Sequence, residues 1–470
     1  MALNFLEIDR RVFTFEDQKK FSNISGDKNP IHLDSNFAKK TIAGECIVHG
    51  IHAFLWALES ISSKINITLS HAVINFKNPI HIDETVILNL DSKLQEIQLL
   101  SIKGVLFISI KYKLSDSLSP MVSTPISSDI NLFEPLDSDV FGLEKGVEIP
   151  SIYGGNQRMA AKIFSNLCTK LGEDRVYEIS LLSNIVGMQV PGLHSLFVAC
   201  DIFFEVGSLD RNPSYKIMES YINLGLLKLQ YTGKNINSNI TALRRPSYTP
   251  KSCDELLKTI PTTHLLKDKK ILVIGGSRGI GAVFSKVAAL NGAKVSVTYA
   301  SNELDAQEIC SDIENHTSAK VKYFHLDVTE NNLIDNFPLD YDVLCYFASS
   351  KIFGKTTTEF EISRYKNFFK IYCEGFERIA KRFLAAGGCC IYYPSSVAVD
   401  KDNKGLEEYK VAKSIGELVC RSLINNKGAN IIIDRLDRVA TDQTLSILRV
   451  PAVDASQVAL DITNKIIKSL

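Results

Sequence analysis

The sequence predicts an α+β N-terminal half followed by an α/β domain built on a parallel sheet with helices on both faces. Up to about residue 246, a helical stretch is followed by several short strand-like runs, and this order occurs twice. From Lys269 to the end, apolar strand-like runs alternate with helical stretches. The length of 470 residues also exceeds what one hydrophobic core supports.

The first block, residues 1–135, is predicted to contain a strand over Arg11–Glu16, a polar loop, one helix and further strands. The helix is expected to begin at Val48-His49-Gly50, because apolar residues follow at helical spacing. The patterns after it predict strands over His71–Phe76, Thr85–Leu90 and Val105–Leu114. This order is expected of a sheet that wraps around the helix.

The second block, residues 136–246, repeats the order, so we interpret the two blocks as copies of one unit. A helix is predicted over Asn156–Leu171 with Gly172 as its C-cap. Strands are predicted over Leu181–Met188, Leu196–Val206, Tyr215–Leu224, Leu226–Tyr231 and Asn239–Leu243. A polar linker containing prolines is expected over 247–268, and one domain over 269–470.

Composition argues against several classes of partner. The 53 Lys and Arg residues equal the 53 Asp and Glu residues, so nothing points to nucleic acid or to an anionic membrane. We expect no membrane span and no signal peptide, because long apolar stretches and a basic start are missing. The ten cysteines form no CxxC pairs, which predicts free thiols in a reducing cytoplasm and no metal site.

The loop before the first helix carries the first chemical signal. Residues 25–34, Ser-Gly-Asp-Lys-Asn-Pro-Ile-His-Leu-Asp, combine a carboxylate and an imidazole in a turn that could bring Asp27 and His32 together. Such a pair suits the addition of water across an α,β-unsaturated thioester, one group handling the proton of water and the other that of the α-carbon. The backbone N–H of Gly50, at a helix N-terminus, could stabilise the enolate charge. The alternative is a surface turn in which His32 only packs.

These residues resemble the MaoC-like (R)-specific enoyl-thioester hydratase family, whose signature stands here as residues 25–34 preceded by Phe21 and followed by His49-Gly50. The resemblance implies that Asp27 and His32 are the catalytic pair and that Gly50 supplies an oxyanion-hole N–H. It also implies a hot-dog fold, so the two blocks would form a double hot-dog. The second block lacks this loop and is expected to complete the substrate pocket. Hot-dog units commonly associate, which makes a homodimer the expectation by analogy.

A glycine-rich loop opens the C-terminal domain. The strand-like run Lys270–Ile274 leads into residues 275–281 and then into a helical stretch, an arrangement that places a pyrophosphate on the helix N-terminus. The cofactor-binding residues predicted in this loop are Gly275, Ser277, Arg278, Gly279, Ile280 and Gly281. The next strand is followed by Tyr299-Ala300-Ser301, with no carboxylate for a ribose 2′-hydroxyl. Arg278 can instead pair with a 2′-phosphate, which favours NADP(H) over NAD(H).

A second group of candidates lies further along the chain. The strand-like run Ile391–Ser396 ends in hydroxyls, and Tyr409 and Lys413 are four residues apart, so they share one helical face. A cation beside the phenol is expected to lower the pKa of Tyr409, which makes it a proton donor to a carbonyl that receives hydride. Ser396 would hold that carbonyl.

The loop, the serine and the YxxxK motif resemble the short-chain dehydrogenase/reductase family. The resemblance implies a doubly wound Rossmann domain in which Ser396 polarises the carbonyl, Tyr409 is the acid/base, and Lys413 binds ribose and tunes Tyr409. It also places Asp327, in Leu326-Asp327-Val328, near adenine. The chain departs from the family at Tyr346-Phe347-Ala348-Ser349, where NNAG is usual, and at Tyr372, where Asn is usual. These departures put the proton relay in doubt.

The two chemistries meet in one class of compound. A short-chain reductase makes a 3-hydroxyacyl thioester from a 3-ketoacyl thioester, and a MaoC-like site removes water from it. The sequence therefore predicts a bifunctional ketoreductase/dehydratase acting on coenzyme A or acyl-carrier-protein thioesters in fatty-acid-like or polyketide-like synthesis. Two alternatives stay open: hydration followed by oxidation, or an active dehydratase fused to a docking or cofactor-sensing domain that has lost its chemistry.

Overall fold

The computed structural model describes residues 5–64, 68–115, 132–137, 142, 144–205, 207–208, 210–317, 319–352, 360–401, 405–427, 429–446 and 450–470. The chain divides into two compact units. The first comprises Met1–Ser247 with Ser446–Leu448, and the second comprises Tyr248–Leu445 with Arg449–Leu470.

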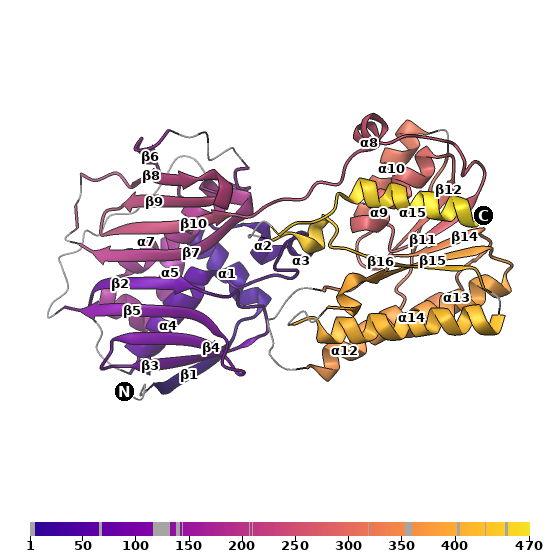
Figure 1. Ribbon diagram of the computed structural model, residues 1–470. Helices are drawn as coiled ribbons and strands as arrows, with labels where there is room; N and C mark the ends of the chain where they lie inside the picture. The colour runs from indigo at the N-terminus through magenta and orange to yellow at the C-terminus, as the bar shows by residue number, and fades with distance from the viewer. Residues whose placement is uncertain are drawn as a thin grey trace. The chain divides into compact units, whose positions relative to one another are not determined.

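The first unit contains a ten-stranded antiparallel sheet in the order β1-β3-β4-β5-β2-β7-β10-β9-β8-β6 (Figure 1). Read from either outer edge to the middle, the order is equivalent: β1-β3-β4-β5-β2 from one side and β6-β8-β9-β10-β7 from the other. The two halves meet where β2 pairs with β7. The strands are β1 Leu6–Val12, β2 Leu69–Phe76, β3 Thr85–Asp91, β4 Glu96–Ser101, β5 Leu106–Leu114, β6 Ile149–Pro150, β7 Ser195–Phe204, β8 Ser214–Tyr221, β9 Leu226–Thr232 and β10 Ile236–Arg244.

Each half of this sheet has one long helix in its core, α4 in the first half and α7 in the second, and these helices contact each other. Both are buried along almost their whole length, because the sheet and the shorter helices cover them. The helices of this unit are α1 Phe15–Ser25, α2 Pro30–Leu33, α3 Ser35–Lys39, α4 Gly50–Ser62, α5 Gln157–Ile163, α6 Ser165–Leu171 and α7 Glu173–Asn184, with a π-helical turn η1 Ile185–Gln189 and 3-10 turns η2 Gly192–His194 and η3 Ile222–Leu224.

The prediction of the helix at Gly50 and of the strands that follow it is confirmed, but the strand predicted over Arg11–Glu16 is wrong. The strand ends at Val12, and helix α1 begins at Phe15. The Thr14 side chain accepts the backbone N–H of Asp17, and the Asp17 carboxylate accepts the N–H of Thr14. This capping box fixes a helix start that the apolar pattern did not indicate.

In the second half, one prediction is confirmed in part and one is wrong. The helix predicted over Asn156–Leu171 is two helices, α5 and α6, separated at Phe164. The strand predicted over Leu181–Met188 is the end of α7 and the turn η1. The apolar run there belongs to a helix that is buried all round, and periodicity cannot distinguish such a helix from a buried strand.

The second unit is a six-stranded parallel sheet in the order β13-β12-β11-β14-β15-β16, as expected from the alternation of strands and helices. Two hydrophobic clusters, one on each side of the sheet, form its core. The strands are β11 Lys270–Ile274, β12 Lys294–Tyr299, β13 Lys322–His325, β14 Val343–Tyr346, β15 Cys390–Ser396 and β16 Ile431–Leu436. The helices are α8 Cys253–Thr259, α9 Gly279–Leu290, α10 Glu303–His316, α11 Asn331–Asp335, α12 Ile362–Phe369, α13 Phe376–Ala385, α14 Glu407–Lys427 and α15 Ala455–Ser469, with the short turns η4 Lys370–Gly375, η5 Val397–Val399 and η6 Asp442–Thr444.

The segment expected to be a linker, residues 247–268, contains helix α8. Its N-terminus is a capping box formed by Ser252 and Glu255, and the side chains of Cys253 and Leu256 are buried in the core of the second unit.

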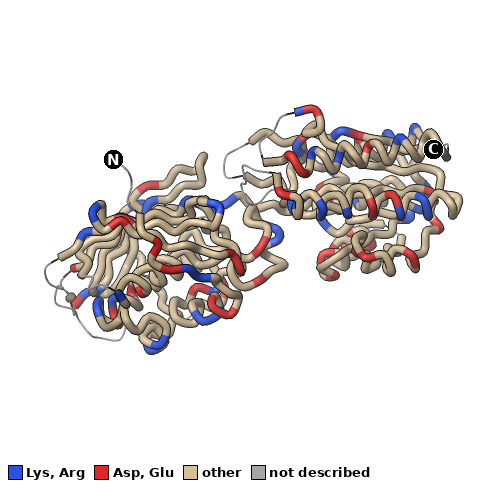
Figure 2. The backbone as a smooth tube through the Cα atoms, turned by 90° about the horizontal axis from the view of Figure 1, so that it is seen from below, with Lys and Arg blue, Asp and Glu red and all other residues tan. Residues whose placement is uncertain are grey.

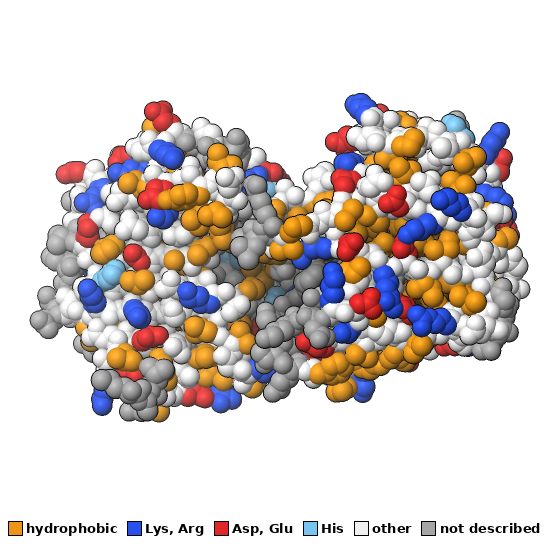
Figure 3. Space-filling view, in the orientation of Figure 1, with side chains coloured by type: hydrophobic (Ala, Val, Ile, Leu, Met, Phe, Trp, Pro, Cys, Tyr) orange, Lys and Arg blue, Asp and Glu red, His pale blue; other side chains and the backbone are white. Residues whose placement is uncertain are grey.

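Along the backbone of both units, Lys and Arg are interspersed with Asp and Glu (Figure 2). On the face shown in Figure 3, exposed hydrophobic side chains gather over α12 and α14 in the second unit, where Ile362, Val411 and Leu418 are among the exposed ones. Among the described helices, none is both long and apolar enough to cross a membrane.

Candidate functional site

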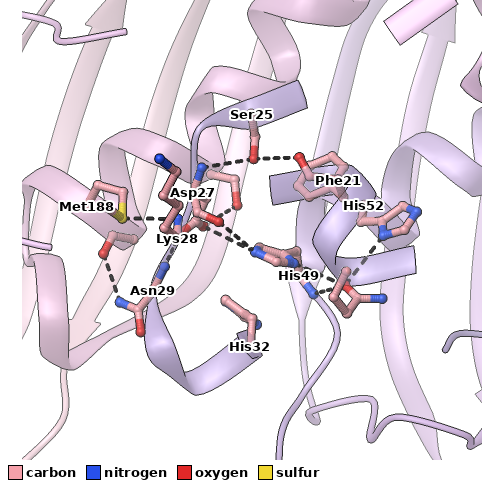
Figure 4. Close-up of polar contacts among 12 residues, drawn as sticks. Phe21, Ser25, Asp27, Lys28, Asn29, His32, His49, His52 and Met188 are labelled. Atoms are coloured by element: carbon pink, nitrogen blue, oxygen red, sulfur yellow. Dashed lines mark hydrogen bonds and ion pairs between the residues drawn. The ribbon is translucent and has the colours of Figure 1, made fainter. Parts of the chain in front are cut away.

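The loop between α1 and α2 brings Asp27 and His32 to one point (Figure 4). Helix α1 ends at Gly26, whose φ of 72° lets the chain turn sharply. The Asn29 side chain then accepts the N–H of Ile31 and starts α2, which presents His32. Ligand-type atoms of Asp27, His32 and His49 all lie within 4.8 Å of one another. The alternative of a surface turn is excluded for Asp27, which is buried.

Hydrogen bonds orient both imidazoles. Nδ1 of His32 lies 2.8 Å from the carbonyl oxygen of Ile47 and donates to it, which leaves Nε2 of His32 as a base. His49 lies against His32 with ring centroids 3.7 Å apart. Its Nδ1 is 3.0 Å from Oε1 of the buried Gln18, and its Nε2 is 4.0 Å from Oδ2 of Asp27. His49 therefore lies between the α1 helix and the carboxylate.

Burial moves the titrations of the pair in opposite directions. It raises the pKa of Asp27 to about 6, although hydrogen bonds from Ser183 and from the backbone of Asn29 lower it. Burial lowers the pKa of His32 to about 4, against the hydrogen bond to Ile47. A carboxyl group whose pKa is raised towards neutrality can give up a proton in the reaction, and an imidazole that stays neutral can accept one, so the two are matched as acid and base.

Gly50 is the first residue of α4 and follows His49, as expected from the sequence. Its N–H makes no hydrogen bond to any residue that the structure describes, so a ligand oxygen can accept it. A Cβ at this position would lie 2.6 Å from the ring of Phe76. Packing against Phe76 is therefore a second reason for glycine here.

The second unit has a cleft of about 1050 Å³ at the carboxyl ends of its strands. The glycine-rich loop forms one wall, with Gly275 at a φ of 73° and Gly279 at 55°. A Cβ on Gly281 would lie 2.3 Å from the carbonyl oxygen of Gly275. Every dinucleotide-site residue predicted from the sequence lines this one cleft: Gly275, Ser277, Arg278, Gly279, Ile280, Gly281, Asp327, Tyr409 and Lys413.

Arg278 is held by Asp442, whose Oδ2 lies 2.9 Å from Nε and 2.5 Å from Nη2 of the guanidinium. The segment Tyr299–Ser301, which lines the same cleft, carries no carboxylate. Asp327 accepts the backbone and side-chain hydrogens of Thr329, which fixes its loop at the cleft. The wall expected to meet a ribose 2′-substituent thus carries the guanidinium of Arg278. The end of strand β12 on the same wall carries no carboxylate that would bind a 2′-hydroxyl instead.

Ser396, Tyr409 and Lys413 also line the cleft, but their electrostatics differ from the expectation. Burial raises the pKa of Tyr409 to about 12, partly offset by a hydrogen bond with Ser396, so the predicted lowering by Lys413 is wrong. Nζ of Lys413 is 5.9 Å from the Tyr409 ring centroid and donates to the carbonyl oxygen of Pro394. Burial lowers the pKa of Lys413 itself to about 7.

Tyr372, where the resemblance led us to expect Asn, lines the same cleft. Its ring lies 4.0 Å from Nζ of Lys413, and its hydroxyl pairs with that of Ser349 at 2.7 Å. Its carbonyl oxygen accepts the hydroxyl of Tyr393 at 3.0 Å. The Lys413 ammonium therefore lies against the aromatic rings of Tyr372 and Tyr393 as well as the carbonyl oxygen of Pro394.

Two groups of side chains in the described residues could also hold a metal ion: Asp27 with His32 and His49, and Cys253 with Asp312 and His316. In the second group Nζ of Lys286 lies 2.6 Å from Asp312, so an ammonium already pairs with that carboxylate. The first group coincides with the candidate acid–base pair.

The sequence reasoning missed three residues around Asp27: Ser183, Gly187 and Gln18. Ser183 and Gly187 were assigned to a strand, so nothing suggested that they face Asp27 across the first unit. Gln18 lies on the helix α1 that was not predicted. A search for Ser/Thr-x-x-Asp/Glu capping signals would have found that helix.

Comparison with known proteins agrees with this geometry. Residues 5–86 match the family model described as MaoC like domain, a range that includes Asp27, His32 and Gly50. Residues 269–339 match the model described as short chain dehydrogenase, a range that includes the glycine-rich loop.

Two curated relatives match one part each. The 3-hydroxybutyryl-CoA dehydratase of Methylorubrum extorquens is 27% identical over 89 residues, which are 18% of this chain and 57% of the relative. The 3-oxoacyl-[acyl-carrier-protein] reductase FabG of Chlamydia muridarum is 36% identical over 70 residues, which are 15% of this chain and 28% of the relative. The matches therefore span less than two thirds of either relative.

Solved structures of short-chain dehydrogenases also match. An alcohol dehydrogenase from Thermococcus sibiricus, complexed with 5-hydroxy-NADP, is 20% identical and covers 43% of this chain and 91% of its own, with a TM-score of 0.38. A short chain dehydrogenase from Burkholderia cenocepacia J2315, in complex with NADP, is 20% identical and covers 42% of this chain and 90% of its own, with a TM-score of 0.38.

Proposed function

Because the chain carries a MaoC-like domain in its N-terminal part and a short-chain dehydrogenase domain further along, we propose that it is a bifunctional enzyme of acyl thioesters. The second domain reduces a 3-ketoacyl thioester with NADPH, and the first dehydrates the resulting 3-hydroxyacyl thioester. The observation that carries this proposal is the convergence of Asp27 and His32, a buried acid and a neutral base, inside the range that matches the MaoC-like domain.

The dehydration follows from the protonation states of the pair. Nε2 of His32 takes the proton from the α-carbon of the 3-hydroxyacyl thioester, and the electrons form the α,β double bond. The hydroxyl at C3 leaves as water with the proton of Asp27. The N–H of Gly50 stabilises the charge that develops on the thioester oxygen. Before dehydration the proton is on Asp27, and afterwards it is on His32. Hydration is the reverse reaction, so in both directions the Asp27/His32 pair holds one proton.

The cleft of the second unit fits a dinucleotide, because Gly281 and Gly275 leave no room for side chains where the backbone approaches. When bound, the nicotinamide cofactor supplies the hydride that reduces the C3 carbonyl. Ser396 orients that carbonyl, and the Tyr409 hydroxyl gives it a proton. Arg278 supports NADPH over NADH, because the exposed part of its guanidinium can pair with a 2′-phosphate.

The shared compound links the two sites, because the product of one is the substrate of the other, and the NADPH preference that we propose favours synthesis as the direction. We propose coenzyme A or acyl-carrier-protein thioesters as substrates, in line with the names of the two curated relatives. The opposite order, hydration and then oxidation, uses the same residues and remains the alternative direction. Ten free cysteines support a reducing, cytoplasmic location.

We propose that the first unit is a double hot-dog, with units over 1–135 and 136–246, followed by the segment 247–268 and a Rossmann domain over 269–470. The equivalent strand order read from either edge of the ten-stranded sheet supports this division. The exposed apolar side chains of Ile362, Val411 and Leu418 support association into a homodimer.

A second function is favoured by the surroundings of Lys413. Aromatic rings enclose its ammonium, and burial raises the pKa of Tyr409 to about 12, both of which disfavour proton transfer. The second domain would then bind NADPH without reducing anything and serve for cofactor sensing or docking. Tight NADPH binding without turnover of any 3-ketoacyl thioester, and a Tyr409→Phe variant that changes nothing, would support that reading.

The proposed function is tested with crotonyl and acetoacetyl thioesters of coenzyme A and of acyl carrier protein. Asp27→Asn removes the acid, so hydration of crotonyl thioester should fall at least 100-fold while NADPH oxidation with acetoacetyl thioester persists. Tyr409→Phe should abolish NADPH oxidation with acetoacetyl thioester while hydration of crotonyl thioester persists. Wild-type enzyme that processes neither substrate on either carrier contradicts the proposal.

A further inference from the structure

Helix α7 of the second half reaches the carboxylate of the first half. The hydroxyl of Ser183, in the last turn of α7, donates to Oδ2 of Asp27 at 2.7 Å. The backbone N–H of Asn29 donates to Oδ1 at 3.1 Å. Ser183 and Asp27 are both buried, so water does not compete for this hydrogen bond.

The residues that follow Ser183 support the same loop. A Cβ on Gly187 would lie 2.4 to 2.6 Å from atoms of the Asp27 carboxyl group, so the carboxylate packs directly on the backbone of η1. The Asn29 amide donates to the carbonyl oxygens of Gly187 at 2.8 Å and Gly192 at 3.1 Å. The backbone N–H of Lys28 also contacts the sulfur of Met188 (Figure 4).

The groups around Asp27 differ in kind between the two halves. Its titratable neighbours come from the first half: His49 at the start of α4 and His32 on α2. The described contacts from the second half come from Ser183 and Gly187, neither of which titrates. The charge of Arg245, at the end of β10, acts on His32 rather than on Asp27. Ser183 is thus the hydroxyl donor that sets the orientation of the carboxylate without adding charge.

We infer that Ser183 is a positioning residue for the dehydratase reaction, through which the half of the sheet that lacks a counterpart of the Asp27/His32 loop fixes the acid of the other half. The inference rests on the proposed function of Asp27. A donated hydrogen bond stabilises a carboxylate more than a carboxylic acid, so Ser183 works against burial, which raises the pKa of Asp27. Loss of the hydroxyl should therefore leave Asp27 misoriented and protonated to higher pH.

The test compares Ser183→Ala with Ser180→Ala in the full chain. Ser180 lies one turn earlier on α7, is equally buried, and donates to the carbonyl oxygen of Tyr177 instead of to Asp27. The kcat, KM and pH profile of crotonyl-thioester hydration are measured for both variants. NADPH oxidation with acetoacetyl thioester by the same preparations serves as the internal standard.

Ser183→Ala should lower kcat about tenfold with little change in KM, as expected for one hydrogen bond to a charged group. The limb of its pH profile near pH 6 should move to higher pH by about one pH unit. Ser180→Ala should change neither. If both variants behave alike, the inference is overturned while the proposed function stands. Wild-type enzyme that does not hydrate crotonyl thioester would overturn both.

Discussion

Arg278 and Asp442 form an ion pair in the dinucleotide cleft, and the side chain of Arg278 is 27% exposed. The Asp442 side chain is only 9% exposed, so its carboxylate is buried while part of the guanidinium stays accessible from the cleft. A buried carboxylate that loses its ion-pair partner destabilises the fold, so we expect a 2′-phosphate to bind the accessible side of Arg278 without displacing Asp442. Arg278 is the N-cap residue of α9, where its side chain makes no capping hydrogen bond.

Arg278→Gln should raise the KM for NADPH about 10- to 100-fold and leave the KM for NADH unchanged, because a hydrogen-bonded ion pair with phosphate is lost. Asp442→Asn, which removes the negative charge beside the guanidinium, should lower the KM for NADPH. Steady-state kinetics with both cofactors check this. An equal effect of Arg278→Gln on NADPH and NADH would contradict a role in 2′-phosphate binding.

At the scale of elements, α7 holds the second half of the first unit together through a buried acid. Glu178 accepts the hydroxyl of Tyr231 at 3.1 Å and the backbone N–H of Asn235 at 2.9 Å. Its carboxyl group packs against Gly233, where any Cβ would collide with it. Burial raises the pKa of Glu178 to about 7, against these hydrogen bonds.

This raised pKa predicts a stability that falls with pH. The folded state binds the proton more tightly than the unfolded state, so the contribution is complete below about pH 4.5 and is lost as the pH rises to about 7. Relative to Glu178→Gln, the wild type should therefore lose roughly 3 kcal/mol of stability between pH 4.5 and pH 8. Glu173→Gln, at the start of the same helix, serves as the control.

The measurement is urea unfolding followed by the fluorescence of Trp56, the single tryptophan of the chain, which lies in α4 and so reports on the first unit. The prediction is contradicted if the difference in the free energy of unfolding between wild type and Glu178→Gln stays constant with pH. Glu178 would then be ionised in the folded state throughout this range.

The sequence predicted the elements whose pattern is set by local chemistry. Helix α4 after Gly50, the alternating elements of the second unit and the glycine-rich loop all appear where expected, because apolar periodicity and turn residues determine them. Helix α7 was missed because it is buried on every side, so its polar residues do not gather on one solvent-facing stripe that would reveal its period. The contact of Ser183 with Asp27 spans 156 positions, and no local pattern encodes it.

For the candidate site, too, the sequence predicted what local motifs determine and missed what depends on packing. Asp27, His32 and the cleft residues could be named from motifs, because each motif places its chemistry within a few positions. Their protonation could not: the sequence suggested a lowered pKa for Tyr409, whereas burial raises it to about 12. Burial depends on the packing of Phe368 and Tyr372 around the phenol, residues 41 and 37 positions before it by their numbers.

At the scale of the whole molecule, the proposed function places two reactions of one thioester on one chain. In this proposal the second unit reduces C3, and the first removes the hydroxyl from C3 together with a proton from C2. The hydrogen delivered to C3 is retained through dehydration, because the proton lost comes from C2. The central claim is that both reactions occur in this order on one compound.

The most direct measurement uses NADPH with deuterium at its transferable position and acetoacetyl thioester, with mass spectrometry of the products. The wild type should yield both 3-hydroxybutyryl and crotonyl thioesters, each with one deuterium at C3. Asp27→Asn should stop at the labelled 3-hydroxybutyryl thioester. Crotonyl thioester without deuterium, or labelled 3-hydroxybutyryl thioester that the wild type never dehydrates, would contradict the account.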